Sequence, residues 1–239
     1  MRNVKLGVNI DHIATLRNAR GEKNPDTVEA ARVVYTSGGD MVVMHLRQDR
    51  RHIQDSDLER VRHEVKGLIH LEMAATSEME KIALRVRPDS VCLVPEGPRE
   101  LTTQGGMKLD KKTPELEKII KNLSKAGIEV SVFTDPEPQA IRAAHNMGAD
   151  SIELCTSKYS ESWGKKLQAK ELEKLQLAGY LVKELEMELH AGHGLDYYNV
   201  VPVARIEGMD CLNIGFSIIS RGMFVGLKSA VAEMKRLIQ

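Results

Sequence analysis

The chain has 239 residues, and its 34 basic and 34 acidic residues give a formal net charge of zero. This balance argues against a nucleic-acid partner or a membrane surface, because such proteins usually carry an excess of basic residues. The composition, 42% hydrophobic and 28% charged, is typical of a globular protein. No apolar run approaches the roughly 18 residues of a membrane span. Three cysteines without metal-binding spacing predict reduced thiols and a cytoplasmic protein.

Eight short apolar runs, several of them rich in Val and Ile, are typical of parallel strands covered on both faces. In chain order they are Lys5–Asp11, Met41–Arg47, Leu68–Ala74, Ser90–Glu96, Glu129–Asp135, Ser151–Ser157, Glu186–Gly192 and Cys211–Ser217. Amphipathic patterns with capping residues fill the gaps and predict helices. These helices are Pro25–Ser37, Asp55–Lys66, Thr76–Val86, Pro114–Lys125, Pro136–Met147, Ala169–Leu185, Val200–Ile206 and Val225–Ile238.

The regular alternation of strand and helix, without a linker rich in Pro, Gly or Ser, predicts one domain over residues 1–239. An eightfold α/β alternation closes naturally as a (β/α)8 TIM barrel, here with extra helices, and such a barrel typically takes about 250 residues. A doubly wound open sheet is the alternative, whereas a leucine-rich solenoid would need a repeated signature that this sequence lacks. The gaps Glu96–Thr113 and Thr156–Lys170 exceed what a helix requires, so we expect loops at the barrel's C-terminal mouth.

Polar side chains interrupt the predicted strands mainly at their C-terminal ends, which converge on one mouth in a barrel. In the second strand His45 and Arg47 lie on one face because side chains alternate. His45 is a potential general base, and Arg47 is a potential clamp for an anion. The other strand ends contribute Asn9, Asp11, Glu72, Glu153 and His193.

Glu72 is the candidate general base, because desolvation raises the pKa of a semi-buried carboxylate unless a cation compensates. Two histidines, His45 and His193, should face it across the mouth. The competing interpretation is a buried ion pair between Glu72 and Arg47. A lone histidine at a strand end is usually structural, but this grouping favours catalysis.

Glycines after the seventh and eighth strands, in Gly192-His193-Gly194 and at Gly215, predict a phosphate cradle made of backbone N–H groups. A second anion site would draw on basic residues near the first two strands. These are Arg20, Arg47, Arg50, Arg51 and His52. Two anion sites predict two phosphorylated substrates or one bisphosphate.

Other chemistries have weaker support. No lysine ends a predicted strand, although Lys158 beyond the sixth strand keeps a Schiff-base aldolase open. The sequence lacks the glycine motifs of nucleotide sites, which argues against nucleotide cofactors. His45, Glu72 and His193 could instead form the two-histidine, one-carboxylate metal site of a metal-dependent aldolase or isomerase.

The same residues lie in motifs that resemble one known family. The stretch Gly7–Gly21, which reads GVNIDHIATLRNARG, resembles the N-terminal signature of the pyridoxine 5′-phosphate synthase family. Further matching motifs run essentially to the end of the chain. They are His45–Arg47, Asp49–Ile53, Leu71–Ala74, Leu93–Glu96, Thr102–Gly106, Ala191–Leu195, Asn199–Val200 and Leu212–Gly215.

The resemblance implies a barrel without metal or cofactor that closes the pyridine ring of vitamin B6. Its two small phosphorylated substrates would be 1-deoxy-D-xylulose 5-phosphate and 3-amino-2-oxopropyl phosphate. Its products would be pyridoxine 5′-phosphate, inorganic phosphate and water. The resemblance also implies a homo-oligomer, an octamer built from dimers.

The resemblance further assigns roles to residues of this sequence. His45 and Glu72 would accept protons, and His193 would donate one. Glu153 would stabilise the cationic, imine-like species that forms during ring closure. The aminoketone phosphate would be held by Asn9, Arg20, Gly194 and Gly215, and the deoxyxylulose phosphate by Asp11, His12, Arg47, His52 and Thr102.

Several positions depart from the family pattern. Phe216 replaces the usual His after Gly215, and it still fits the site if the family uses the backbone N–H there. Cys155 also replaces a usual His, whereas His70 and His190 replace Asn. Because the three proton-transfer residues are intact, we expect activity. The alternative is a catalytically silent sensor of phosphorylated metabolites.

Overall fold

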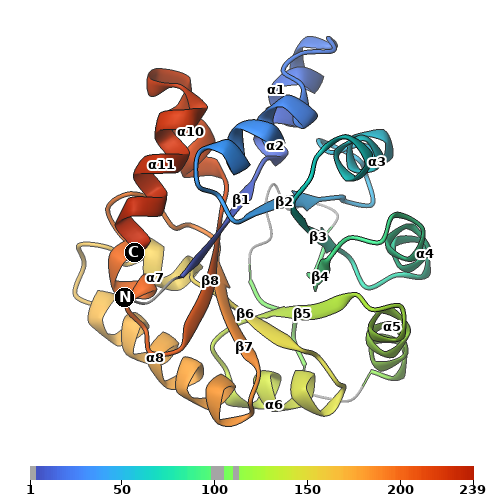
Figure 1. The fold of residues 1–239 in the computed structure, drawn as a ribbon. Helices are drawn as coiled ribbons and strands as arrows, with labels where there is room; N and C mark the ends of the chain where they lie inside the picture. Colours follow the sequence, from blue (N-terminus) through green and yellow to red (C-terminus); the bar gives the residue numbers. More distant parts are fainter. Residues whose placement is uncertain (1–3, 98–104, 110–112) are drawn as a thin grey trace.

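The computed structural model describes residues 4–97, 105–109 and 113–239. Within these ranges eight parallel strands hydrogen-bond in chain order, and the last strand pairs with the first, so the sheet is a closed barrel. Helices surround the ring of strands on its outer side (Figure 1). This architecture confirms the predicted (β/α)8 TIM barrel and excludes the open doubly wound sheet.

The strands are short and follow the predicted apolar runs, most of them inside the expected limits. Their bounds are β1 Lys5–Asn9, β2 Met41–His45, β3 Leu68–Met73, β4 Ser90–Leu93, β5 Glu129–Thr134, β6 Ser151–Cys155, β7 Glu188–Gly192 and β8 Met209–Ile214. The last strand begins two residues before its predicted start.

The helices include all the predicted ones, with ends that differ by a few residues. Their bounds are α1 Asp11–Arg20, α2 Thr27–Thr36, α3 Asp55–Glu64, α4 Ser77–Val86, α5 Pro114–Lys125, α6 Pro138–Asn146, α7 Ser157–Glu161, α8 Gln168–Glu184, α9 Val200–Ala204, α10 Phe216–Val225 and α11 Leu227–Ile238. None of them is both long and apolar enough to cross a membrane.

Three helices, α1, α7 and α10, are not among those that the sequence predicts. The first strand was expected to continue to Asp11, but the Asp11 N–H donates to Asn9 Oδ1 at 2.9 Å, and α1 begins in this turn. Similarly, β8 ends before Gly215 and α10 follows at once, although the strand was expected to reach Ser217. Both helices bury few side chains, so their sequences lack a strong amphipathic pattern.

Each strand presents two different faces because successive side chains point in opposite directions. The outer-face side chains of Val42, Leu71 and Ile152 are almost fully buried and belong to the main hydrophobic core. On the inner face the polar side chains of His70 and Glu153 are equally buried. The barrel therefore packs its helices with apolar groups and encloses polar groups. All three cysteines are free and buried, as predicted.

Candidate active site

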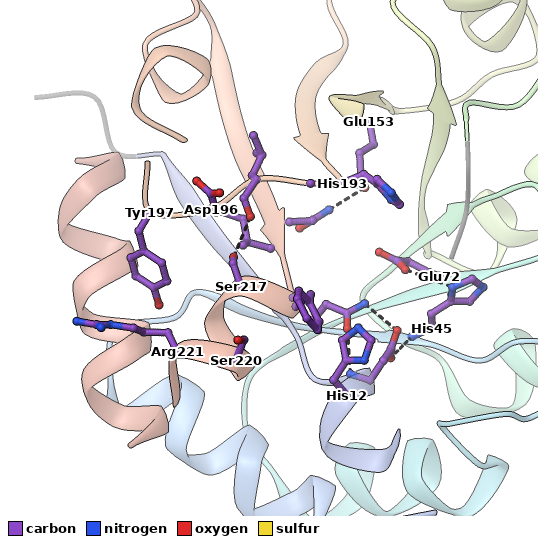
Figure 2. A pocket seen from close by; sticks show the side chains of 18 of the residues that line it. His12, His45, Glu72, Glu153, His193, Asp196, Tyr197, Ser217, Ser220 and Arg221 are labelled. Carbon is purple, nitrogen blue, oxygen red and sulfur yellow. Dashed lines mark hydrogen bonds and ion pairs between the residues drawn. The ribbon is translucent and has the colours of Figure 1, made fainter. Parts of the chain in front are cut away.

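The C-terminal ends of the strands surround a cavity of about 1080 Å³. It brings together most of the predicted site residues. Those that line it are Asn9, Asp11, His12, His45, Arg47, His52, Glu72, Glu153, His193, Gly194, Gly215 and Phe216. Figure 2 shows His12, His45 and Glu72 grouped on one side of this cavity, with Glu153 and His193 together on another. The structure thus places these residues at one mouth, and their roles stay predictions.

Arg50 and Arg51, which were also predicted for the second anion site, pair with Asp55 and Asp49 and do not line the cavity. Arg20 and Thr102 are further exceptions. Arg20 is exposed at the C-terminal end of α1 and does not line the cavity. Thr102 lies outside the residues that the structure describes, so its predicted role in a lid stays a prediction.

Glu72 projects inward from β3 and has the properties expected of a base. Its side chain is 16% exposed, and Oε2 lies 3.6 Å from His45 Nδ1. Burial raises the pKa of Glu72 well above its usual range, and the nearby carboxyl groups of Glu153 and Asp11 raise it further. The competing interpretation was a buried ion pair between Glu72 and Arg47. Arg47 instead forms its ion pair with Asp49, at 3.7 Å.

His45 lies between two carboxylates. Its Nε2 is 2.9 Å from Glu96 Oε1, and its Nδ1 faces Glu72. Burial acts to raise the pKa of Glu96, but hydrogen bonds with His45 and from the Gln48 N–H outweigh it, so the net shift is downward. The sequence alone gave no reason to choose Glu96 over a cap or a rim ion pair. Here it holds the imidazole from the side opposite Glu72.

Glu153 is 3% exposed on β6, and its Oε2 accepts a hydrogen bond from Asn213 Nδ2 at 2.7 Å. Burial raises its pKa, although this hydrogen bond acts against the shift. Gly192 leaves the space that this carboxylate occupies, because a Cβ there would lie 2.3 Å from Glu153 Oε1. A protonatable group is thus held rigidly at the cavity wall.

His193 follows β7 with a left-handed backbone, φ 79°. Thr156 Oγ1 donates to the His193 carbonyl at 2.5 Å and holds this turn. The ring lies against Phe133, with centroids 6.4 Å apart, and burial lowers the pKa of His193. A neutral imidazole that has an N–H can still donate a proton to a developing leaving group.

The turn after β8 is suited to an anion. Gly215 precedes the ten-residue helix α10, whose first N–H groups have no intrahelical partner. A Cβ on Gly215 would lie 2.9 Å from Asn9 Cβ, so glycine is needed for this close approach. The Phe216 side chain is 69% exposed and contacts the His12 ring edge-on at 5.3 Å. Only the backbone of Phe216 is therefore placed to bind phosphate.

Arg47 and His52 lie beyond β2 on the other side of the mouth. Arg47 is 3% exposed, and its Nε has no hydrogen-bond partner among the described residues. The His52 ring is 5.9 Å from the His45 ring, and burial lowers its pKa. A buried guanidinium whose Nε makes a 3.7 Å ion pair with Asp49 but no hydrogen bond among the described residues is well suited to a second anion.

The inner face continues below the cavity with His70 and His190, two of the positions that depart from the family pattern. His70 Nδ1 is 2.6 Å from Ser90 Oγ, and burial lowers the pKa of His70 to about 3. His190 Nε2 is 3.2 Å from Glu188 Oε2, and this hydrogen bond helps to lower the pKa of Glu188 to about 2. The two rings are 6.3 Å apart. Neither ring lines the cavity.

Comparison with known proteins agrees with this site. The family described as "Pyridoxal phosphate biosynthesis protein PdxJ" matches residues 6–239. The chain belongs to this family. A pyridoxine 5′-phosphate synthase of Elusimicrobium minutum is 54% identical over 237 residues, which cover 99% of this chain and 98% of the relative. Another, from Syntrophotalea carbinolica, is 50% identical over 98% of each chain.

Solved structures with low sequence identity agree with the fold. Phosphoribosylanthranilate isomerase from Thermotoga maritima superposes with a TM-score of 0.61 at 14% identity and covers 98% of both chains. KGPDC from Streptococcus mutans gives a TM-score of 0.66 at 14% identity, covering 99% of this chain and 98% of its own. At such identities the likeness concerns the barrel alone. The family membership, in contrast, confirms the predicted resemblance and the expectation of an enzyme of vitamin B6 biosynthesis.

Proposed function

We propose that this protein makes pyridoxine 5′-phosphate from 1-deoxy-D-xylulose 5-phosphate and 3-amino-2-oxopropyl phosphate, with inorganic phosphate and water as further products. The observation that carries the proposal is a pair of carboxylates, the largely buried Glu72 and the buried Glu153, at one mouth between two regions suited to anions. Joining an amine to a ketone and forming an aromatic ring requires repeated proton transfers beside fixed phosphates. This mouth offers both.

Glu72 and His45 serve as the proton acceptors. The raised pKa of Glu72 suits a base that works near neutral pH, because such a group can both take up and release a proton. Glu96 fixes His45 Nε2 and leaves Nδ1 facing Glu72. A proton taken by one group can therefore pass to the other over 3.6 Å with a small movement.

Glu153 and His193 act on the other side of the bound substrates. A carboxylate at Glu153 stabilises the positive charge that develops on the imine nitrogen, and low exposure strengthens this interaction. His193 donates a proton to the departing oxygen. Its turn also carries Gly194, whose left-handed backbone, φ 77°, approaches the aminoketone phosphate.

Two phosphates set the orientation of the substrates. The N-terminus of α10 and the turn at Gly215, together with Asn9, hold the phosphate of the aminoketone. Arg47 and His52 hold the phosphate of the deoxyxylulose substrate across the mouth. Fixing both ends brings the amine and the ketone together, which replaces a bimolecular encounter by a unimolecular step.

The protein functions in the cytoplasm and assembles as a homo-oligomer, an octamer built from dimers. Free, buried thiols suit a reducing compartment. Exposed apolar side chains on α1 and α10 support the assembly, because Leu16 is 47%, Met223 72% and Phe224 85% exposed. Light scattering of the purified protein measures the assembly directly, and a monomeric mass would contradict it.

The test mixes purified protein with both substrates in the presence of a chelator. Fluorescence follows pyridoxine 5′-phosphate, and a second assay follows phosphate. We expect the two products in equal amounts, while the Glu72→Gln variant forms both far more slowly. Binding of both substrates without product would instead identify a silent sensor.

A metal-dependent aldolase or isomerase remains the second candidate, supported by one observation. Ligand atoms of Asp11, His45 and Glu72 lie within 4.8 Å of one another, so a cation could bind at the mouth. His193 does not belong to this group, contrary to the metal site considered from the sequence. Activity that is lost with chelator and restored by a divalent cation would favour this candidate.

A further inference from the structure

A second group of potential metal ligands lies inside the barrel, beneath the catalytic mouth. One ligand atom each of His70, Cys92 and Glu153 lies within 4.8 Å of the others, and all three residues are buried. We propose that this group, together with His190, binds a thiophilic divalent transition-metal ion such as Zn²⁺ or Co²⁺. The site is distinct from the cluster of Asp11, His45 and Glu72 because it contains a thiol.

Two buried imidazole nitrogens point to a ligand at this position. His70 Nε2 and His190 Nδ1 have no hydrogen-bond partner in the described part of the chain. His70 is 0% exposed, so its unpaired nitrogen is unfavourable as it stands. It lies 3.9 Å from Glu153 Oε2. That separation is too long for a hydrogen bond but short enough for both atoms to reach one ion at about 2.0–2.2 Å each.

The other nitrogen of each ring is already bonded in the manner of a metal-binding histidine. His190 Nε2 faces Glu188 Oε2 at 3.2 Å, and a carboxylate only accepts, so this nitrogen carries the proton. The lone pair then lies on Nδ1. His70 Nδ1 is 2.6 Å from Ser90 Oγ, and the hydroxyl can accept a hydrogen bond from Nδ1–H, which leaves the lone pair on Nε2. Such outer contacts orient the ring and raise its affinity for metal.

Charge and geometry suit a tetrahedral ion. A thiolate from Cys92 and the carboxylate of Glu153 neutralise a divalent cation, and two neutral imidazoles complete four ligands. Ligand atoms around such an ion lie about 3.3–3.8 Å apart, so a contraction of about 1 Å assembles the three-residue group. His190 neighbours Glu153 in strand register, and its ring is 6.3 Å from that of His70, which brings it into reach.

An ion could reach this site from the cavity, and its binding should lower turnover. Glu153 lines the cavity, so an ion can pass from the mouth to the ligands below. Once bound, it neutralises the charge that Glu153 offers to the developing cation, and turnover should fall at least about tenfold. This consequence rests on the proposed function, whereas the binding itself does not.

The two histidines of the proposed site are departures from the family pattern. His70 and His190 stand where the resemblance leads us to expect Asn, an amide that binds transition metals poorly. Converting each back to Asn is therefore a mild change with a specific loss of ligand. Cys155 supplies a matched control, because it is another buried thiol in the same small inner cluster as Cys92.

The experiment titrates chelator-treated protein with Co²⁺ and records absorption. We expect one Co²⁺ per chain with tetrahedral d–d bands and a thiolate-to-cobalt charge-transfer band, and Zn²⁺ should displace it. Cys92→Ser should abolish the charge-transfer band. His70→Asn and His190→Asn should weaken binding at least about tenfold, and Ser90→Ala about 10–100-fold through the lost outer contact. Cys155→Ser should bind like the parent.

Each contrary result would disprove a specific part of the proposed metal site or of its effect. The absence of a charge-transfer band, or its survival in Cys92→Ser, would disprove the site. Normal binding by both Asn variants would remove the histidines from it. Tight binding without loss of turnover would disprove the effect on Glu153. Failure of the protein to form pyridoxine 5′-phosphate, with the cobalt spectrum intact, would overturn the proposed function and leave the metal site standing.

Discussion

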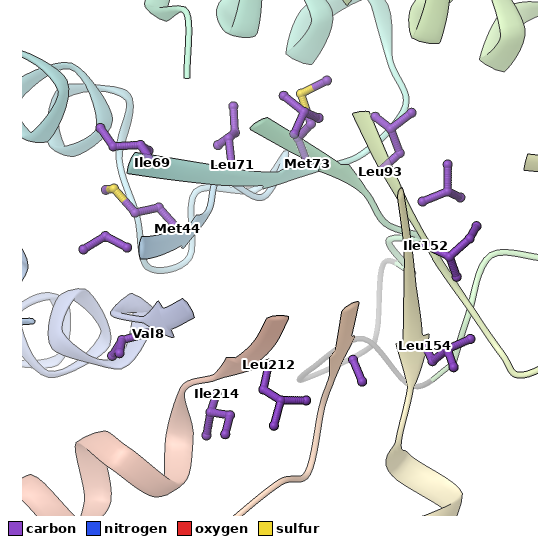
Figure 3. Packing of buried hydrophobic residues seen from close by; sticks show 14 of the residues in the cluster. Val8, Met44, Ile69, Leu71, Met73, Leu93, Ile152, Leu154, Leu212 and Ile214 are labelled. Atoms are coloured by element: carbon purple, nitrogen blue, oxygen red, sulfur yellow. The ribbon is translucent and has the colours of Figure 1, made fainter. Parts of the chain in front are cut away.

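The two faces of the barrel strands differ in chemistry although they are built from alternate residues of the same short strands. Figure 3 shows Ile69, Leu71 and Met73 on the outer side of the ring of strands. The residues between them, His70 and Glu72, face the interior of the barrel, where they meet polar partners. Adjacent positions therefore serve different ends: the outer ones stabilise the fold, and the inner ones do chemistry.

This division differs from the usual interior of such barrels, which is packed with bulky branched residues. Among the residues that the structure describes, the inner face has two small apolar groups of side chains, one of Met41, Val43 and Cys211 and another around Phe133. Burying Glu153 and His70 instead costs stability, since each is removed from water with incomplete compensation. The outer layer must supply that stability, and the comparison can be tested one residue at a time.

Glu72→Gln should have the largest effect on activity. Removing the base should lower turnover by about 10²–10⁴-fold, the usual contribution of general acid–base catalysis. The circular dichroism spectrum should not change, because the side chain keeps its size. Steady-state kinetics measure the loss, and Glu173→Gln on the exposed face of α8 is the control. Near-normal turnover in Glu72→Gln would refute its role.

Leu71→Ala tests the outer face one residue away. Leu71 is 1% exposed, and its truncation should lower the free energy of unfolding by about 2–5 kcal/mol. Turnover per folded molecule should stay within a few-fold of the parent. Denaturant unfolding measures the change, and Leu177→Ala, at a side chain 65% exposed, should change stability by less than about 0.5 kcal/mol. If Leu71→Ala lost activity while keeping its stability, the two faces would not be separable.

His193→Asn should impair a chemical step that follows substrate binding. We choose Asn because it tolerates the left-handed backbone at φ 79°, where Ala would add strain. Loss of the proton donor should lower kcat about 10²-fold and leave KM nearly unchanged. The comparison variant is His145→Asn on the exposed side of α6. A rise in KM alone would assign His193 to binding instead of proton transfer.

Much of this arrangement follows from local sequence patterns. Period-two alternation places His45 and Glu72 on the inner face, and the eightfold repeat brings their strand ends together. The helices α1 and α10 could not be predicted in this way, because they bury few side chains. The limit of the first strand also depends on a side chain, Asn9, that bonds to the backbone of Asp11.

Contacts between residues far apart in the sequence could not be predicted from local patterns. Glu96 bonds His45 across 51 residues, and no spacing in the sequence distinguishes it from a cap. The pairing of His70 with His190 likewise depends on how β3 and β7 face each other across the barrel. Motif resemblance placed Arg20 among the phosphate ligands, yet in this chain it stays outside the cavity. Only the closed barrel supplies these relations.

The smallest predicted effect is on folding stability, and it measures what burying the Glu72 carboxylate on the inner face costs. Burial and neighbouring acids raise the pKa of Glu72, so the folded state holds its proton more tightly than the unfolded state. The charge of Glu72 therefore destabilises the fold as pH rises from the ordinary carboxyl range, about 4.3, through the raised value.

Glu72→Gln should accordingly unfold at a higher temperature than the parent at neutral pH, and the difference should shrink as pH falls toward that ordinary range. Thermal unfolding by calorimetry at several pH values measures it, with Glu173→Gln as the flat reference. A destabilised Glu72→Gln at neutral pH would mean that the ion pair with His45 outweighs the cost of burial. The inner face would then contribute to stability as well as to chemistry, and the division between the two faces would fail at this residue.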